Sequence, residues 1–415
     1  MISPAPSSSF SRSEKLFILF AMICGFLISG EYAITRPTSN ALFLSFFSAK
    51  GYPWAWLAIV PINLLAIDLY NRFLPKIGPL RVLLVVASFT ICINTFAALF
   101  SSQAPLLIFF QYSWKEIYIL LMFKQLWSMI HSTIPATRAK YLYGCIYGMG
   151  TVGAIIGSLV PSLFAVNLGS ERILFFTLPV YFLLILAYSS AFKRSGVEKC
   201  FSQLLTTDPR PREAYSLIRK SSTLIVALLL VVFMQVVTGL MEYRFNANLE
   251  LNILDKDLRT AYCGSLGTII GGASLVLQFL GTFVFIRLLG VKKGHLLIPL
   301  LLLFLTLITL IFPTFGILTL SYAFLKAIDF SIFGVIREML YVPLKLDEKF
   351  RAKAVIDVFA YRSSKALVSL ALLILPAFAG IYFLQLTTLI SVFILTLWFV
   401  VVYLYFRRSE DLQKA

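Results

Sequence analysis

Apolar residues form long runs along the chain, and short polar or Pro/Gly-rich breaks separate one run from the next. A helix that crosses a bilayer needs about 20 predominantly apolar residues. Runs of this length predict membrane-spanning helices. The twelve predicted spans lie near residues 16–36, 53–71, 80–100, 104–130, 141–168, 172–192, 222–246, 260–287, 294–313, 315–336, 352–379 and 380–406.

The longest polar stretch separates the sixth predicted span from the seventh. It predicts a cytoplasmic linker at 196–221 between six-helix halves at 1–195 and 222–415. Four short matches recur between the halves at offsets of 211, 212, 211 and 213 residues, which favours a duplicated six-helix unit. The matches pair Glu31-Tyr32 with Glu242-Tyr243, Gly78 to Arg81 with Gly290 to Lys293, Lys115 with Lys326, and Arg138 to Lys140 with Arg351 to Lys353. The sequence therefore predicts an all-α membrane protein with two pseudo-symmetric halves.

Composition excludes a soluble protein, since 59% of residues are hydrophobic and 13% are charged, against roughly 25% charged in soluble domains. The net charge is +17, and with both termini inside, 25 of the 36 lysines and arginines fall in inner segments. This asymmetry follows the positive-inside rule. It explains most of the charge by topology, so no nucleic-acid partner is predicted.

Residue types typical of catalytic and metal sites are sparse. The five cysteines form no C-x-x-C pair, and there are two histidines, so no disulfide, metal site or cofactor is expected. A phosphate-binding loop of the G-x-x-x-x-G-K-[ST] type and an H-E-x-x-H motif are both missing from the sequence. We therefore expect no enzymatic activity and no catalytic residues.

The stretch Asp68-x-x-x-Arg72, followed by Gly78-Pro-Leu-Arg81, resembles the major facilitator signature between helices 2 and 3. In a fold of that type, helices 1, 4, 7 and 10 line the central cavity. Those are the predicted helices that carry Glu31, Lys115, Glu242 and Lys326.

Charged residues inside the spans are the candidate functional residues, because an ionisable side chain at mid-bilayer costs at least about 2.5 kcal/mol without a partner or water. Lys115 and Lys326 have no evident partner of equal strength, so facing ammonium groups would hold a multivalent anion. The alternative is that Lys115 pairs with Glu116 or Asp329 for packing. Adjacent residues on a helix point about 100° apart, which argues against the Glu116 pair.

Two further groups have alternative interpretations. Arg36, expected at the end of the first helix, is either an interfacial arginine or part of a gate or substrate site. Arg337-Glu338 and residues 347–353 are expected to form salt bridges between the halves during alternating access, rather than to bind substrate directly. In the fifth helix, the Gly-x-x-x-Gly spacings predict close helix packing.

The segments 337–344 and 353–358, Arg-Glu-Met-Leu-Tyr-Val-Pro-Leu and Lys-Ala-Val-Ile-Asp-Val, resemble the ATP/ADP translocase family of plastids and obligate intracellular bacteria. Tyr32-Ala-Ile-Thr-Arg36, Leu240-Met-Glu242 and the spacing from Glu116 to Trp127 extend the resemblance to both halves. It implies that Glu116, Glu242 and Lys326 are charged transport residues.

The chain departs from the family pattern where Ser39 and Asp329 replace expected lysines, and where the family's Gly-Lys-Ser-Gly run is reduced to Arg362-Ser-Ser-Lys365. Arg337 also stands where the family signature has a lysine. Because this sequence has fewer cationic side chains at these positions than the family pattern, the substrate can be a less charged nucleotide or another organic anion.

Together these features predict a secondary transporter of the bacterial inner membrane that moves nucleotides by exchange, with both termini cytoplasmic. The predicted partners are an anionic small molecule and the lipid bilayer, with no obligate protein partner. The predicted substrate-binding residues are Lys115, Glu116, Lys326, Glu242, Arg36 and Lys365. The predicted gating or coupling residues are Glu31, Asp329, Arg337, Asp357 and Arg362.

Two alternatives remain open at this point. One is proton-coupled symport of another organic anion or metabolite, with Glu31, Glu116 or Asp329 as the coupling carboxylate. The other is a membrane scaffold or receptor subunit without transport.

Overall fold

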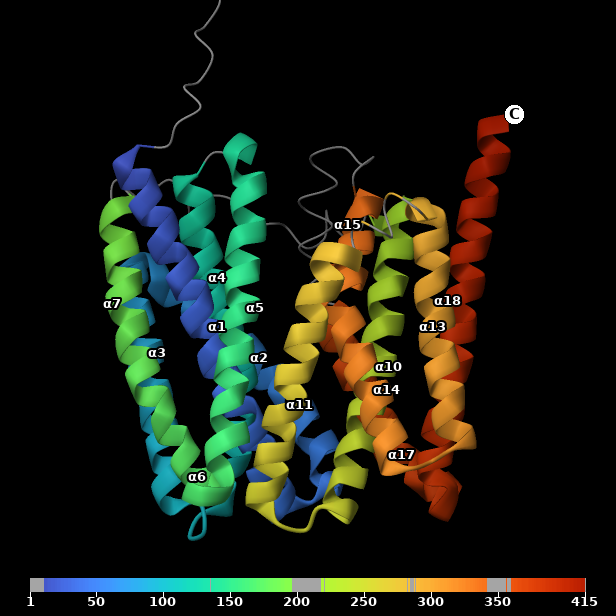
Figure 1. Ribbon diagram of the computed structural model, residues 1–415, viewed down its shortest axis with the longest axis horizontal. Helices are drawn as coiled ribbons and strands as arrows, with labels where there is room; N and C mark the ends of the chain where they lie inside the picture. The colour runs from blue at the N-terminus through green and yellow to red at the C-terminus, as the bar shows by residue number, and fades with distance from the viewer. Residues whose placement is uncertain are drawn as a thin grey trace, which may run out of the picture. The chain divides into compact units, whose positions relative to one another are not determined.

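The computed structural model is almost entirely helical, and it contains no β-strand within the ranges that it describes. Those ranges are residues 11–134, 136–195, 218–219, 221–281, 283, 287, 289–341, 356 and 360–414. The N-terminal half comprises α1 (Arg12–Phe47), α2 (Tyr52–Ile77), α3 (Pro79–Phe100), α4 (Pro105–Thr133), α5 (Ala136–Leu168), α6 (Ser170–Ile173) and α7 (Thr177–Ser195) (Figure 1). The C-terminal half comprises α10 (Ser222–Asn252), α11 (Lys256–Val276), α13 (Gly290–Ile311), α14 (Phe315–Ile328), α15 (Gly334–Tyr341), α17 (Tyr361–Ala379) and α18 (Phe383–Lys414).

The described helices account for the twelve predicted spans. Eleven continuous helical segments are long and apolar enough to cross a membrane, and Ser363–Ala379 forms a shorter apolar helix. The sixth span is built from α6, a 3-10 turn and α7, and the tenth joins α14 to α15 through a π-helical turn at Asp329–Phe333. The prediction of an all-α membrane fold is confirmed.

The first helix continues well beyond its predicted end. The expectation that α1 stops at Arg36, before Pro37, is wrong, because the helix continues to Phe47. Proline removes one backbone donor, but in membrane helices nearby Ser or Thr hydroxyls can help to satisfy backbone carbonyls. Pro37 leaves the Ala33 carbonyl without its helical donor, and at the next carbonyl along the helix Thr38 Oγ1 donates to Ile34 at 3.0 Å. Arg36 therefore lies inside the helix.

Two compact units make up the structure. The first consists of the described residues within Met1–Phe43, Ile62–Thr207 and Thr260–Thr268. The second consists of those within Leu44–Pro61, Asp208–Arg259 and Ile269–Ala415. Each unit thus takes in a short piece of helix from the other half of the sequence, so the compact units differ at two places from a simple division at the linker.

A large apolar core holds the first unit together, with buried side chains from α1, α3, α4 and α7, among them Phe17, Leu83, Tyr118 and Tyr188. In the second unit, α13 packs along α18, and α10 packs against α14, α17 and α18. These contacts place α1 beside α4 in one unit and α10 beside α14 in the other. The helices that carry the candidate charged residues are therefore neighbours within each unit.

Glycines bring α5 against α1, as the spacing predicts. A Cβ atom on Gly153 would lie 2.1 Å from the carbonyl oxygen of Phe26, and one on Gly157 would lie 2.1 Å from that of Gly30. At Gly144 and Gly148, in contrast, a Cβ atom would meet nothing within 4 Å. Only the second Gly-x-x-x-Gly pair therefore makes the predicted close packing.

The segment that resembles the major facilitator signature begins inside a helix. Asp68 and Arg72 form an ion pair of 2.8 Å on an exposed face of α2, one turn apart. Gly78 follows with φ +82°, a conformation that favours glycine, and Pro79 begins α3. The connection between α2 and α3 is therefore a tight turn at Gly78.

Candidate functional site

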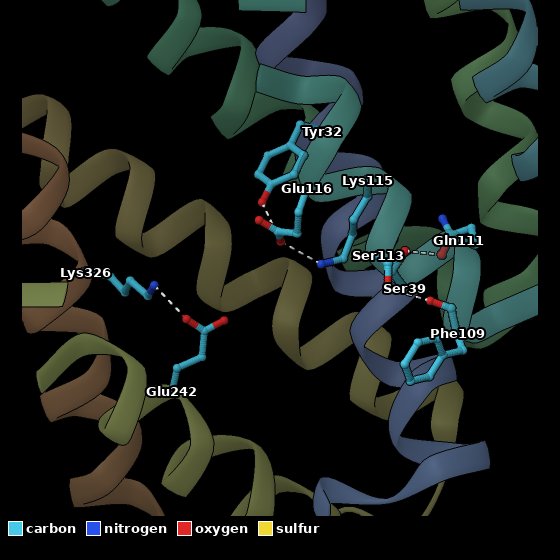
Figure 2. Close-up of polar contacts among 9 residues, drawn as sticks. All are labelled: Tyr32, Ser39, Phe109, Gln111, Ser113, Lys115, Glu116, Glu242 and Lys326. Atoms are coloured by element: carbon cyan, nitrogen blue, oxygen red, sulfur yellow. Dashed lines mark hydrogen bonds and ion pairs between the residues drawn. The ribbon is translucent and has the colours of Figure 1, made fainter. Parts of the chain in front are cut away.

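In the first unit, the candidate site is a buried ion pair on α4 that α1 supports. Lys115 Nζ lies 2.8 Å from Glu116 Oε1, and Tyr32 OH donates to the same oxygen at 3.1 Å (Figure 2). The Lys115 side chain is 1% exposed, whereas that of Glu116 is 23% exposed. The lysine is thus held inside the unit, and the carboxylate is the member of the pair that reaches solvent.

An aromatic ring contributes to holding Lys115. Its Nζ lies 3.9 Å from the ring centroid of Tyr112, one helical turn earlier, and a ring face attracts a cation. The Tyr112 ring in turn packs 4.5 Å from that of Phe43 on α1. The contacts of α1 with α4 therefore fix the position of the ammonium group.

The second unit contains a comparable pair formed across two helices. Lys326 Nζ on α14 lies 3.0 Å from Glu242 Oε2 on α10, and the two side chains are 6% and 12% exposed (Figure 2). Lys326 lies one turn before the π-helical turn at Asp329–Phe333, and π turns occur often at functional sites. The rings of Tyr322 and Phe330 lie 5.7 and 5.8 Å from its ammonium group.

These pairs correct one expectation. The idea that neither lysine has a partner of equal strength is wrong, because each lies against a carboxylate. The argument from the 100° spacing fails at Lys115 because its four-carbon side chain is long enough to reach the neighbouring carboxylate. The roles of Lys115, Glu116, Lys326 and Glu242 in substrate binding stay predictions.

Glu31 is buried and Asp329 is half-buried, and neither forms an ion pair with another residue that the structure describes. Glu31 Oε1 accepts a hydrogen bond of 2.6 Å from Thr35 Oγ1, and Asp329 Oδ1 accepts one of 3.4 Å from Gln235 Nε2. The packing alternative named Glu116 or Asp329 as the partner of Lys115, and the structure shows the pair with Glu116. Arg36 is half-buried within α1.

The remaining predicted residues lie in the second unit. Arg337 Nη2 lies 3.7 Å from its neighbour Glu338 on α15, and Lys365 Nζ lies 5.2 Å from the ring centroid of Trp56. Asp357, the Arg362 side chain and residues 347–353 lie outside the part of the chain that the structure describes. The salt bridges expected between the halves therefore stay a prediction.

A buried chain of hydrogen bonds in the first unit was not anticipated from the sequence. Ser39 Oγ donates to Gln111 Oε1 at 2.5 Å, Gln111 Nε2 donates to Asn94 Oδ1 at 3.2 Å, and Asn94 Nδ2 donates to Thr177 Oγ1 at 3.3 Å. The chain crosses from α1 through α4 and α3 to the start of α7. The sequence feature that could have indicated this chain is the presence of two amide side chains, Asn94 and Gln111, within apolar spans. Ser39, where the family pattern has a lysine, thus makes a neutral contact.

Comparison with known proteins agrees with this architecture. Residues 210–407 match the sequence model of the TLC ATP/ADP transporter family. The match lies in the C-terminal half of the chain. The resemblance seen in the motifs at 337–344 and 353–358 is thereby confirmed, and the match and the fold together support a membrane transporter. A search of curated proteins finds no matching sequence.

Solved structures of major facilitator transporters share the fold. The nucleoside transporter NupG, as its D323A mutant, superposes with a TM-score of 0.66 at 13% identity, covering 93% of this chain and 99% of its own. A POT family transporter in complex with 5-aminolevulinic acid gives 0.66 at 13%, covering 95% and 96%. The xylose transporter XylE from E. coli gives 0.61 at 14%, covering 95% and 98%. At such identities the likeness establishes the fold alone.

Proposed function

We propose that this protein is a secondary transporter that carries nucleotides or closely related phosphate-bearing anions by alternating access. The observation that carries the proposal is the pair of buried ammonium groups, one in each unit, each held by a carboxylate that is more exposed than the lysine. The family match at residues 210–407 supports the nucleotide class.

In the proposed binding step, a substrate phosphate competes with a carboxylate of the protein for each lysine. Charge-assisted hydrogen bonds to phosphate oxygens are strong, and lysine binds phosphate as a compact point charge. A phosphate group that reaches Lys115 or Lys326 can replace Glu116 or Glu242 without leaving the ammonium group uncompensated. The carboxylates thus hold the cations while no anion is bound.

The pairs also change the argument about exchange. Unpaired lysines would make closure of an empty carrier costly, because the closed site would bury uncompensated charge. Each lysine is paired with a carboxylate, so the empty carrier can close without burying an uncompensated ammonium group. Electrostatics therefore does not make exchange obligatory. We therefore propose that exchange of internal for external nucleotide is one mode of transport.

Proteoliposome flux tests the proposal. Purified protein in vesicles preloaded with labelled ATP should release the label faster when unlabelled ATP or ADP is added outside. Lys115→Ala and Lys326→Ala should each lower this flux at least about tenfold, the effect of losing roughly 1.4 kcal/mol of substrate interaction.

The matched control is Lys124→Ala, since this exposed lysine on α4 donates to Asn71 Oδ1 at 2.8 Å and has no part in the pair. Its flux should stay close to that of the wild type. Unchanged flux in both the Lys115 and Lys326 variants, or no flux of any nucleotide in the wild type, would contradict the proposal.

We also propose that the protein resides in a bacterial inner membrane with both termini in the cytoplasm. The support is the excess of lysine and arginine in alternate connections, which marks the cytoplasmic side.

A further inference from the structure

Glu31 lies in an unusual place for an acidic side chain. It is 1% exposed in the middle of α1. Oε1 accepts a hydrogen bond from Thr35, and Oε2 is buried without a hydrogen-bond partner among the described residues. The Tyr181 hydroxyl of α7 lies near this carboxyl and is likewise buried without a partner within hydrogen-bond distance.

Among the residues that the structure describes, Glu31 forms no ion pair, and the polar groups that lie near its carboxyl are the hydroxyls of Thr35 and Tyr181. From α3, Thr90 lies near Tyr181, and α5 presents the backbones of Gly153 and Gly157 next to Gly30. On α4, Lys115 and Glu116 pair with one another, and Tyr32 of α1 contacts this pair. Tyr181 is thus the titratable group that faces the carboxyl.

The second unit shows the contrast. The 211-residue repeat relates Glu31 to Glu242 and Lys115 to Lys326, and in the second unit these two residues form an ion pair. In the first unit Lys115 instead holds Glu116, whose repeat equivalent is Ala327. Equivalent acids are therefore neutralised in different ways, and Lys115 has a second carboxylate available to it.

An isolated buried carboxylate is costly enough that the group takes up a proton instead. We propose that Glu31 is a proton-binding site, occupied in this state, and that it releases its proton when Lys115 moves from Glu116 to Glu31, so that transport is coupled to proton movement. This inference rests on the proposed transport function and adds the coupling ion to it.

The step balances simply. The Glu31 carboxyl gives H⁺ to water and becomes a carboxylate, the Lys115 ammonium stays charged, and the new ion pair repeats the Glu242–Lys326 arrangement. Glu116 loses Lys115 but keeps the hydrogen bond from Tyr32, and its side chain is 23% exposed, so its charge can be hydrated. Tyr32, the residue after Glu31, already reaches Glu116 from α1 (Figure 2).

Infrared spectroscopy tests the proton directly, without any transport. The purified protein at neutral pH should show the carbonyl stretch of a protonated carboxyl group, and Glu31→Gln should remove that band. Tyr181→Phe should shift the band without removing it, because the facing hydroxyl is lost while the carboxyl remains. An unchanged band in Glu31→Gln would overturn the proposal, as would failure of this variant to fold, since an amide closely mimics the neutral acid.

Transport under an imposed pH gradient tests the coupling. With the membrane potential clamped, acidifying the outside of proteoliposomes should raise wild-type uptake of labelled ATP several-fold. Glu31→Gln should lose this rise but keep exchange of ATP for ATP, which needs no net proton release. The matched control, Glu171→Gln, changes another acid of the same unit in α6 and should respond as the wild type does.

The outcomes separate the two proposals. Exchange of ATP without any response to the pH gradient would leave the carrier standing and overturn proton coupling. A gradient response in Glu31→Gln equal to that of the wild type would assign coupling to another group. Absence of nucleotide flux together with a Glu31-dependent infrared band would overturn the nucleotide carrier and retain the proton site.

Discussion

At the scale of single residues, the buried charges are arranged so that each lysine at the candidate site has a carboxylate at hydrogen-bond distance. Such a pair contributes little net stability, because desolvation offsets most of the attraction, yet removal of one member leaves an uncompensated charge. We therefore expect these pairs to serve substrate binding rather than stability, because a phosphate group of the substrate can take the place of the carboxylate.

This predicts an asymmetric stability effect at Lys326. Lys326→Met should lower the free energy of unfolding by about 3 kcal/mol, because Glu242 loses its ammonium partner in a buried position. The double variant Glu242→Gln/Lys326→Met should recover most of this loss, since no charge remains, while transport stays lost in both. Denaturant unfolding in detergent micelles measures the difference; equal stability of the single and double variants would be inconsistent with the pair.

At the scale of elements, two features of the helices could not be predicted from the apolar pattern: the end of α1 and the π turn in the tenth span. The pattern is satisfied equally by a helix that ends before Pro37 and by one that continues, as α1 does, to Phe47. The π turn at Asp329–Phe333 likewise leaves hydropathy unchanged. Both features concern the backbone hydrogen-bond pattern within a helix, which the hydropathy of the residues does not report.

The packing of α5 on α1 gives a prediction with an internal control. Gly157→Ala should lower stability by about 1–3 kcal/mol, the usual effect of overpacking, because the new Cβ would lie 2.1 Å from the Gly30 carbonyl oxygen. Gly148→Ala, on the same helix, should be neutral or slightly stabilising, because nothing lies within 4 Å and alanine favours helix. Thermal unfolding of the two variants measures the contrast, and equal melting temperatures would contradict it.

At the scale of the whole molecule, charge asymmetry predicts which side of the membrane each connection faces. Ser102, in the exposed turn between α3 and α4, should be outside, and Lys76, at the end of α2, should be inside. Single cysteines at these positions, in a background without the five native cysteines, should react oppositely with a membrane-impermeant thiol reagent added to intact cells. If the cysteine at position 76 alone were labelled, the predicted orientation would be wrong, and the connection after α2 would lie outside.

The sequence by itself determined the number, order and approximate extent of the membrane helices, because bilayer thickness sets the required length of each apolar run. Its short motifs also indicated a resemblance to the ATP/ADP translocase family, and residues 210–407 match the sequence model of the TLC ATP/ADP transporter family. Charged residues inside apolar spans were visible for the same reason, since each is expensive in lipid.

Only the tertiary structure decided which charges meet. Lys326 pairs with a residue 84 positions away, whereas Lys115 pairs with its immediate neighbour, although the repeat makes the two lysines equivalent in sequence. Hydropathy is a property of each residue, but an ion pair depends on the distance and direction between side chains that packed helices impose. The buried state of Glu31 has the same origin, since it follows from how α1, α3, α5 and α7 surround one carboxyl group.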